Sequence, residues 1–561
     1  MENLILRQHS WRSAARNLWA TQVLQLLLLI IAFGFLAHNA QAQSPTMDEQ
    51  NHIARGCALL RTGDPRLSVE HPPLINLLEA LPLGRGVTLP LDDVSWRRGD
   101  WYRFADLFLW QANASPDRIV FLARMPIVAL TLLLGALAGR WGQEIGGRYA
   151  GVLALGFILL DPNLLAHGSL ATTDLGVTFA TLLASYVLWR TEAKPCLLRL
   201  GINGLAIGLL LASKMSAWVV WGGLGVAFLW QVWGNDRWRS EGGWQAVTRS
   251  VVLRGFLYLG ITVLALLVVW AVYAFQLASS TDHGPLIPMG TYWRGIGQIF
   301  RQVQGGRPSY LLGKTRLGGW RLYFPIAFLV KTPLASLLLI TCAVGLSRVV
   351  TRQSVGAFLL LPVLVYWGAA LASDLNIGYR HLLPTLPLLY VWGAQQLSLV
   401  DGSRWRRIGL GLLLWLAAET VWIAPDFLPY FNPIGGGPEH GWRVLADSNI
   451  DWGQDLKRLS VYLRTHAHGE RVKLSWFGSS YPERYGIEDY EPLPGLPHHF
   501  DLWFQPPTFN EAQPEPGLYV ISVSNLVELP LVDKHFFAYF RDREPDARIG
   551  YSVYIYRVGE N

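Results

Sequence analysis

Apolar stretches long enough to cross a lipid bilayer recur along this chain of 561 residues and limit what it can fold into. A helix needs roughly 17–25 mainly apolar residues to span the hydrocarbon core. Only 16% of the residues are charged, whereas about a quarter are charged in an average soluble domain. The sequence therefore predicts a polytopic α-helical membrane protein. About eleven transmembrane helices are expected, at 17–37, 119–138, 149–165, 169–189, 198–213, 216–233, 254–275, 322–347, 355–372, 381–400 and 407–425.

The basic residues of the short loops predict the orientation of the chain, because cytoplasmic loops carry an excess of Arg and Lys. The short loops "AHGSLATT" and "SDLNIGY" contain neither residue type. With a cytoplasmic N-terminus, the opposite loops hold Arg7, Arg12, Arg16, Arg140, Arg148, Arg190, Lys194, Arg199, Arg237, Arg239, Arg249, Arg254, Arg348, Arg352, Arg404, Arg406 and Arg407. The net charge of +7 therefore reflects a cytoplasmic rim facing anionic lipid and does not argue for nucleic acid.

The composition divides the chain into two parts. Residues 1–425 form a transmembrane module interrupted by an outer loop at 38–118, where a short amphipathic helix should stop at Gly63 and a second should begin after two prolines. Residues 426–561 contain the strand-like runs "RVKLSWFG", "GLYVISVS" and "YSVYIYRV" and a helix at 452–466, which predicts an extracytoplasmic α/β domain. A cleaved signal peptide ending at "AQA" is the alternative for the N-terminus.

Two adjacent acids, Asp48 and Glu49, follow the first span on the outer side. Acidic residues in a first helical turn favour the helix dipole and need no catalytic role. Alternatively, one carboxylate is a general base at the membrane surface. Further along the outer loop, Glu70 and His71 begin "EHPPL", where the imidazole could donate to an anion or ligate a metal beside Glu70. A surface helix cap explains these two residues equally well.

Four further charged residues are predicted at the outer ends of spans. Asp174 is either a functional carboxylate at a helix mouth or a first-turn residue. Lys214 lies at the tip of a hairpin of two short spans, where it could hold a lipid phosphate or extend towards lipid headgroups. Lys331 and Arg380 are expected in the same outer half. Carboxylates and cations together match a reaction in which a lipid phosphate leaves and a hydroxyl attacks, and lipid-linked sugars are donors of that type.

The segment "DSNIDWGQD", residues 447–455, places acidic and amide residues at alternate positions, as a calcium loop does. It lacks the glycine at the sixth position, which is Trp452, and the closing glutamate, which is Arg458. The favoured interpretation is a helix start with Asp451 as N-cap and Gln454 completing a capping box.

Six motifs in chain order resemble one family: "MDEQNH", "HPPL", "ASKMSAW", "YFPIAFLVKTPL", "NIGYRHLLPTLP" and "DSNIDWGQDL". The pattern is similar to that of protein O-mannosyltransferases and their bacterial relatives, including aminoarabinose transferases. These are membrane glycosyltransferases of the GT-C fold (glycosyltransferase family 39-like). The resemblance covers most of the chain.

The resemblance implies roles for the charged residues. Asp48 matches the catalytic base, Glu49 is its acidic neighbour and Asp174 is a second acidic residue at a helix mouth. Lys214 and Arg380, with His71 and Lys331, would bind the donor phosphate. At the position of His71 the aminoarabinose branch has a lysine. No cofactor is required, although some relatives carry a divalent metal near the equivalents of Glu70 and His71.

The resemblance implies transfer of a sugar from a polyprenyl-phosphate donor to an acceptor hydroxyl, with inversion, at the outer face of a bacterial inner membrane. The acceptor could be a protein, a lipid or a glycan, and membrane lipids are the remaining partners. Two alternatives are a membrane transporter and an oligosaccharyltransferase-like enzyme with a lipid pyrophosphate carrier. A transporter should carry charges on both sides of the membrane midplane, whereas those predicted here gather in the outer half.

Overall fold

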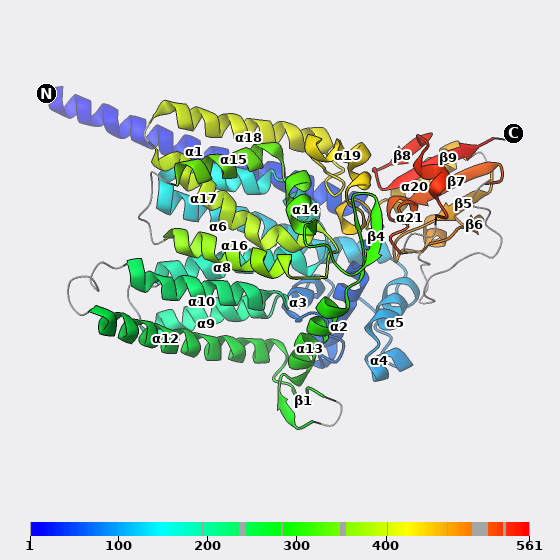
Figure 1. The fold of residues 1–561 in the computed structure, drawn as a ribbon, viewed down its shortest axis with the longest axis horizontal. Helices are drawn as coiled ribbons and strands as arrows, with labels where there is room; N and C mark the ends of the chain where they lie inside the picture. The colour runs from blue at the N-terminus through cyan, green and yellow to red at the C-terminus, as the bar shows by residue number, and fades with distance from the viewer. Residues whose placement is uncertain are drawn as a thin grey trace.

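A bundle of long helices, with a small sheet at one end, makes up the computed structural model (Figure 1). It describes residues 2–191, 196–234, 243–281, 284–347, 355–400, 402–467, 469–495, 514–530 and 535–559. The bundle helices are α1 (Glu2–Ala42), α6 (Pro116–Leu159), α8 (Thr173–Thr191), α9 (Leu197–Leu211), α10 (Ala217–Gly234), α12 (Gly243–Val272), α14 (Tyr323–Lys331), α15 (Leu334–Leu346), α16 (Val355–Leu371), α17 (Leu386–Leu399) and α18 (Ser403–Ile423). Of the loop residues used to predict orientation, Lys194, Arg237, Arg239, Arg348 and Arg352 lie outside the described residues.

Helix α6 is a hairpin. At Gly147 the backbone adopts a φ of 78°, outside the helical region. A Cβ atom on Gly135 would lie 2.7 Å from the Leu159 side chain, and one on Gly139 would lie 3.1 Å from Leu155 Cβ. Residues so far apart in one helix can meet only if the chain reverses, and glycine lets the two arms approach closely. The arms match the predicted spans 119–138 and 149–165, except that the second arm ends at Leu159 and α7 (Pro162–Gly168) follows separately.

Fewer helices than predicted meet the length and hydropathy needed for a membrane span among the described residues. Within the part of the chain that the structure describes, three helical segments are long and apolar enough to cross a bilayer: Trp19–Ala42, Trp244–Val272, and Pro116–Leu159, which contains both arms of the hairpin. Two bent pairs, α7 with α8 at 115° and α14 with α15 at 111°, raise this number to five. The helices Leu197–Leu211, Ala217–Val232 and Val355–Leu371 are apolar but shorter. Eleven spans are therefore not confirmed, because breaks in the chain divide several of the predicted stretches.

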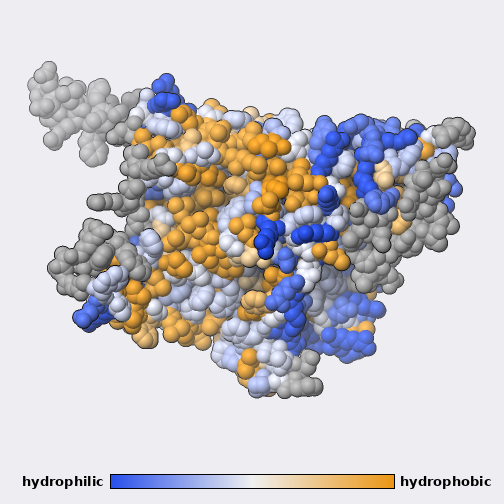
Figure 2. Space-filling model, in the orientation of Figure 1, coloured by the Kyte–Doolittle hydropathy of each residue, from blue (hydrophilic) through white to orange (hydrophobic). Residues whose placement is uncertain are grey.

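The side of the bundle is apolar, as Figure 2 shows, whereas hydrophilic residues cover the end that carries the sheet. On helix α12, for example, Phe256 is 67% exposed and Leu259 is 59% exposed. Soluble proteins rarely expose large contiguous apolar surfaces, so this side of the bundle is suited to lipid.

Short elements lie at the sheet end of the bundle (Figure 1). The helices are α2 (Glu49–Thr62), α3 (Leu74–Ala80), α4 (Val94–Arg98), α5 (Trp101–Asp106), the π-helical η1 (Leu107–Gln111) and α13 (Gly290–Gly305). Two hairpins accompany them, β1 (Leu277–Ser279) with β2 (Leu286–Pro288), and β3 (Pro308–Leu311) with β4 (Lys314–Leu317). Helix α2 ends at Gly63, which has a left-handed φ of 70°, and α3 begins after Pro73, as predicted.

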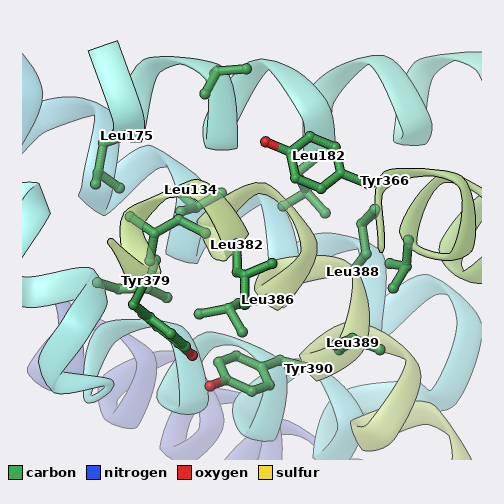
Figure 3. Packing of buried hydrophobic residues seen from close by; sticks show 14 of the residues in the cluster. Leu134, Leu175, Leu182, Tyr366, Tyr379, Leu382, Leu386, Leu388, Leu389 and Tyr390 are labelled. Atoms are coloured by element: carbon green, nitrogen blue, oxygen red, sulfur yellow. The ribbon is translucent and has the colours of Figure 1, made fainter. Parts of the chain in front are cut away.

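The 3-10 helix η2 (Tyr379–Thr385) leads into α17 and is fixed by the bundle core. Figure 3 shows Tyr379 and Leu382 of η2 packed among leucines of α6, α8 and α17. The Tyr379 hydroxyl lies 2.8 Å from Thr332 Oγ1. Arg380 follows directly in the chain, so its backbone is held by buried neighbours.

The C-terminal region forms a five-stranded mixed sheet in the order β6-β5-β7-β9-β8. Strand β5 is parallel to β6 and β7, and β9 is antiparallel to β7 and β8. The strands are β5 (Val472–Ser475), β6 (Tyr490–Pro492), β7 (Gly517–Ser522), β8 (Ala547–Ile549) and β9 (Val553–Val558), and α20 (Leu456–His466) packs on them. The three predicted strands are confirmed.

The start of this helix differs from the prediction. Helix α20 begins at Leu456, with Asp455 and not Asp451 at the N-cap position. The Asp451 carboxylate instead accepts hydrogen bonds from the backbone N–H of Ser524 at 2.9 Å and of Gly453 at 3.3 Å. A capping box requires only local contacts, whereas here the Asp451 carboxylate is bonded by the backbone N–H of Ser524, which is far away in the sequence.

Asp451 makes stability depend on pH. Burial raises the pKa of its carboxyl from 3.8 to about 8. A raised pKa means that the folded state holds the proton of Asp451 more tightly than the unfolded state does. The protonated carboxyl therefore contributes its full stabilisation below pH 3.8, and this stabilisation is lost as pH rises through about 8. We expect the melting temperature to fall between about pH 5 and pH 9, and to fall less steeply in Asp451→Asn. Asp489→Asn, whose side chain is 83% exposed, is the control. An unchanged slope in Asp451→Asn would contradict this prediction.

Candidate active site

A cavity of about 1250 Å³ opens at the sheet end of the bundle, between α2, α8, α10, α13, η2 and the segment that follows residue 446. Six of the eight residues predicted from the sequence line it: Asp48, Glu70, His71, Asp174, Lys214 and Arg380. The other two, Glu49 and Lys331, are buried elsewhere.

Asp48 stands at the first position before helix α2. Its side chain makes no capping bond to the helix and instead accepts a hydrogen bond from Arg380 Nη1 at 3.0 Å. The side chain is 31% exposed, so a ligand in the cavity can reach it. The dipole interpretation of this acid is therefore incomplete, because the carboxylate faces a cation from a distant helix.

Four charged residues form a continuous chain of ion pairs. From Asp48 the chain continues through Arg380, whose Nη1 also lies 3.8 Å from Asp174 Oδ2. Asp174 Oδ1 in turn lies 2.6 Å from Lys214 Nζ. The two cationic side chains are only 10% and 11% exposed. Because both cations line the same cavity, they can bind an anion there when one of their carboxylate partners moves away.

Asp48 and Glu70 are ionised at neutral pH. Burial alone would raise the pKa of Asp48, but the Arg380 guanidinium outweighs it and holds the pKa below its ordinary value. The same balance, with Arg55 as the cation, lowers the pKa of Glu70. Burial and Arg55 lower the pKa of His52 to about 4, so this imidazole is neutral at pH 7. Asp48 is therefore available as a proton acceptor.

The residues around Glu70 and His71 fit an ion pair better than a metal. Glu70 Oε2 accepts a hydrogen bond from Arg55 Nη2 at 2.9 Å, and Arg307 lies 3.9 Å from Glu70 Oε1. The His71 ring packs against that of His52, with 5.1 Å between centroids. Within the described ranges, no group of three or more His, Cys, Asp or Glu residues could hold a metal ion. Glu70 and His71 therefore do not form a three-ligand metal site among the described residues, and Glu70 is instead neutralised by Arg55.

Glu49 is a structural residue in this geometry. Its carboxylate accepts hydrogen bonds from Arg124 at 2.6 and 2.7 Å, from Thr46 N at 2.8 Å and from Ala171 N at 2.7 Å. The residue has 0% exposure. The structure argues against the predicted catalytic role, because a carboxylate with both oxygens bonded and no exposed surface cannot reach a substrate.

Lys331 also lies apart from the cavity. Its Nζ donates to the backbone oxygens of Leu428 at 2.8 Å and Asn449 at 2.7 Å, and the residue is 2% exposed. The predicted contact with a donor phosphate is therefore not supported. Lys331 instead ties α14 to the segment that leads into the C-terminal sheet.

Several cavity residues were missed from the sequence. His52 and Arg55 follow Asp48 at helical spacing on α2, and this spacing could have identified them. Trp452 lies under the Arg380 guanidinium, 4.2 Å from Cζ to the ring centroid. Asp447 also lines the cavity, and burial raises its pKa to about 6. The last two belong to the family-like motif "DSNIDWGQDL", but their place in the cavity depends on the tertiary fold.

The chain shows low similarity to several solved structures. No curated protein matches the sequence. Among solved structures, the chain is similar to ArnT from Cupriavidus metallidurans bound to undecaprenyl phosphate, with 11% identity and a TM-score of 0.48 over 94% of this chain and 97% of that one. It is also similar to the Archaeoglobus fulgidus oligosaccharyltransferase with a tethered acceptor peptide, with 12% identity and a TM-score of 0.45 over 86% of this chain and 61% of that one. For the S. cerevisiae Pmt1-Pmt2 complex bound to the sugar donor, the values are 16% and 0.34, over 46% and 33%.

The family model of dolichyl-phosphate-mannose-protein mannosyltransferases matches residues 102–283. This range includes α8 and the turn between α9 and α10, which supply Asp174 and Lys214 to the cavity. The resemblance to protein O-mannosyltransferases predicted from the sequence is thereby confirmed for this segment of the chain.

Proposed function

We propose that this protein is a membrane glycosyltransferase that moves a sugar from a polyprenyl-phosphate carrier to an acceptor hydroxyl. The observation that carries the proposal is the chain of ion pairs Asp48–Arg380–Asp174–Lys214 along one wall of one cavity. The family match supports it, because the family is named for a donor in which mannose is linked to a lipid phosphate. A base beside two phosphate-binding cations is what such a transfer needs.

The donor phosphate binds Lys214 and Arg380, and its lipid chain follows the apolar wall. That wall includes Trp218 on α10 and Ile296 and Phe300 on α13. Phe300 is 66% exposed, so the wall continues to the surface of the protein. His71, at the edge of the same cavity, is available to contact the donor.

The transfer is a single displacement. The acceptor oxygen forms a bond to the anomeric carbon as the bond from that carbon to the phosphate oxygen breaks, and configuration inverts. The bonding electrons leave with the phosphate, where Lys214 and Arg380 stabilise the added charge. Asp48 receives the proton of the acceptor hydroxyl.

Donor binding also activates the base. Arg380 lowers the pKa of Asp48 while the two are paired. When the guanidinium turns to the phosphate, the carboxylate loses part of this stabilisation and becomes a stronger proton acceptor. The free protein thus holds the base in a weakly basic state until the donor is present.

The reaction takes place at the extracytoplasmic face of a bacterial inner membrane, with residues 426–561 on the same side. The charge asymmetry of the short loops supports this orientation. The acceptor is a protein, lipid or glycan hydroxyl that enters from that face.

The test supplies purified protein with several polyprenyl-phosphate sugars and measures release of the carrier. We expect release from at least one phosphate-linked sugar by the wild type and little by Asp48→Asn. Release only from pyrophosphate-linked oligosaccharides would favour an oligosaccharyltransferase reaction instead. Transport without release would overturn the proposal.

Replacing Lys214 with Gln should raise the KM for the donor. A hydrogen bond to a charged group is worth about 1.5–3 kcal/mol, so we expect a rise of roughly tenfold to a hundredfold. Lys214→Arg, which keeps the charge, should lose less. Lys314→Gln, at an exposed lysine of β4, is the control. A KM that changes equally in both Gln variants would contradict this role.

A further inference from the structure

Residues 447–454, "DSNIDWGQ", connect the C-terminal sheet to the cavity. Asp447 and Trp452 line the cavity itself. The Asp451 carboxylate accepts a hydrogen bond from the backbone N–H of Ser524, two residues beyond the end of strand β7, at 2.9 Å. The Ser524 hydroxyl lies 3.2 Å from the backbone nitrogen of Asp447. This segment is therefore joined to the sheet on one side and to the cavity on the other.

The segment contacts the backbone on the N-terminal side of Arg380. Asn449 Oδ1 accepts a hydrogen bond from the Tyr379 N–H at 2.8 Å, and Ser448 Oγ donates to the Ile377 oxygen at 2.6 Å. Gly378 lies between these contacts with a φ of 145°, and a Cβ atom there would collide with Ser448 Oγ. Only glycine permits this close approach.

Asn449 and Trp452 are themselves firmly held. Asn449 Nδ2 donates to the Tyr323 hydroxyl at 3.0 Å and to the Ala446 oxygen at 2.7 Å, so its amide has a fixed orientation. Trp452 is 1% exposed and presents its ring to the Arg380 guanidinium at 4.2 Å. A buried aromatic ring gives the guanidinium a defined plane to rest on.

The same segment also contacts the chain that leads to Asp48. The Trp452 oxygen accepts a hydrogen bond from the Met47 N–H at 3.1 Å, and the Gln454 oxygen accepts one from the Ser44 N–H at 2.9 Å. The Ser44 hydroxyl donates to the Gly453 oxygen at 2.9 Å. Met47 is the residue directly before Asp48, so one short segment holds both partners of the pair.

We infer that residues 447–454 are a positioning element that sets the geometry between Asp48 and Arg380, and that the C-terminal domain is needed for sugar transfer through this element. The inference rests on the proposed function and adds a role for the domain. In this role the residues position other groups and do not react with the substrate. They hold the backbone segments that carry the base and the phosphate-binding cation at a fixed separation.

The test compares Trp452→Leu with Trp452→Phe in the full-length protein. Loss of the ring should raise the donor KM roughly tenfold, because the guanidinium loses its cation–π contact, whereas Phe keeps an aromatic ring and most of the activity. Phe540→Leu is the control, since Phe540 is a fully buried aromatic of the same domain that packs on Tyr519 and Tyr556. It should leave the donor KM at the wild-type value.

The pH profile separates positioning from general damage. Asp48 is faced by Arg380, His52 and Glu70, and by Asp447 across the cavity. If Arg380 moves away, the acidic limb of kcat/KM should shift to higher pH in Trp452→Leu and stay in place in Phe540→Leu. Ser448→Ala, which removes the bond to Ile377, should shift the limb in the same direction and provides the result if Trp452→Leu does not fold.

The outcomes distinguish this inference from the proposed function. A wild type that releases no carrier from any polyprenyl-phosphate sugar refutes the function. An active wild type with an unchanged donor KM and acidic limb in Trp452→Leu and Ser448→Ala refutes the positioning role. Equal changes in Phe540→Leu would refute it too, because the effect would then come from the stability of the domain.

Discussion

Replacing Asp48 with Asn should lower kcat by roughly 10²–10⁴-fold, the usual contribution of a general base, while the protein stays folded. The amide cannot accept the proton of the acceptor hydroxyl at the moment of attack. The substitution keeps the shape of the side chain, which is 31% exposed and carries none of the backbone bonds of helix α2. The measurement is carrier release from a saturating polyprenyl-phosphate sugar, alongside the melting temperature.

Donor binding gives this prediction a second signature. Asp48 pairs with Arg380 in the free protein, so its neutral substitute leaves the guanidinium less compensated. We expect Asp48→Asn to bind the polyprenyl-phosphate donor as tightly as the wild type or more tightly, whereas Lys214→Gln should bind it less well. Asp64→Asn, just after helix α2, is the matched control for activity. Transfer by Asp48→Asn at nearly the wild-type rate would end the assignment of the base.

The helices could be predicted from the sequence because a bilayer demands long apolar runs, but not all of their breaks could. The reversal at Gly147 depends on contacts between glycines and leucines more than twenty positions apart, such as Gly135 with Leu159. The bend between α14 and α15 comes directly after Lys331, whose ammonium group donates to the backbone oxygens of Leu428 and Asn449. Pro333 marks this bend in the local sequence, because proline disfavours a continuous helix, whereas the reversal at Gly147 depends on tertiary contacts.

The site could be predicted in part because charges beside membrane spans are costly and are therefore functional candidates. Four such residues are brought together by the fold: Asp48, Asp174, Lys214 and Arg380. The free-energy cost of burying a charge does not by itself indicate whether that charge faces a cavity or a buried partner. Glu49 and Lys331 satisfy the same criterion, yet their partners are fixed by the fold and are far away in sequence.

Glu49→Gln should destabilise the protein by about 3–5 kcal/mol, the usual cost of removing one partner of a buried ion pair. The side chains of Glu49 and Arg124 are 0% and 1% exposed, and the guanidinium lies 2.6 Å from the carboxylate. The single amide oxygen of Gln can accept from Thr46 or from Ala171 but not from both, since these two N–H groups bind different carboxylate oxygens, and the arginine charge is left without a counter-ion. The melting temperature in detergent is the measurement, and we expect a large drop.

A double variant tests whether the loss comes from the unpaired charge. Glu49→Gln with Arg124→Met removes both charges and should recover the part of the loss that comes from the unpaired charge, but not the hydrogen bonds from Arg124 to the backbone oxygens of Ala40, Gln43 and Ser44. The fraction that remains folded in Glu49→Gln should keep Asp48-dependent transfer, because successive helical residues point about 100° apart and Asp48 faces the cavity independently. A stable Glu49→Gln protein without activity would instead return Glu49 to the reaction.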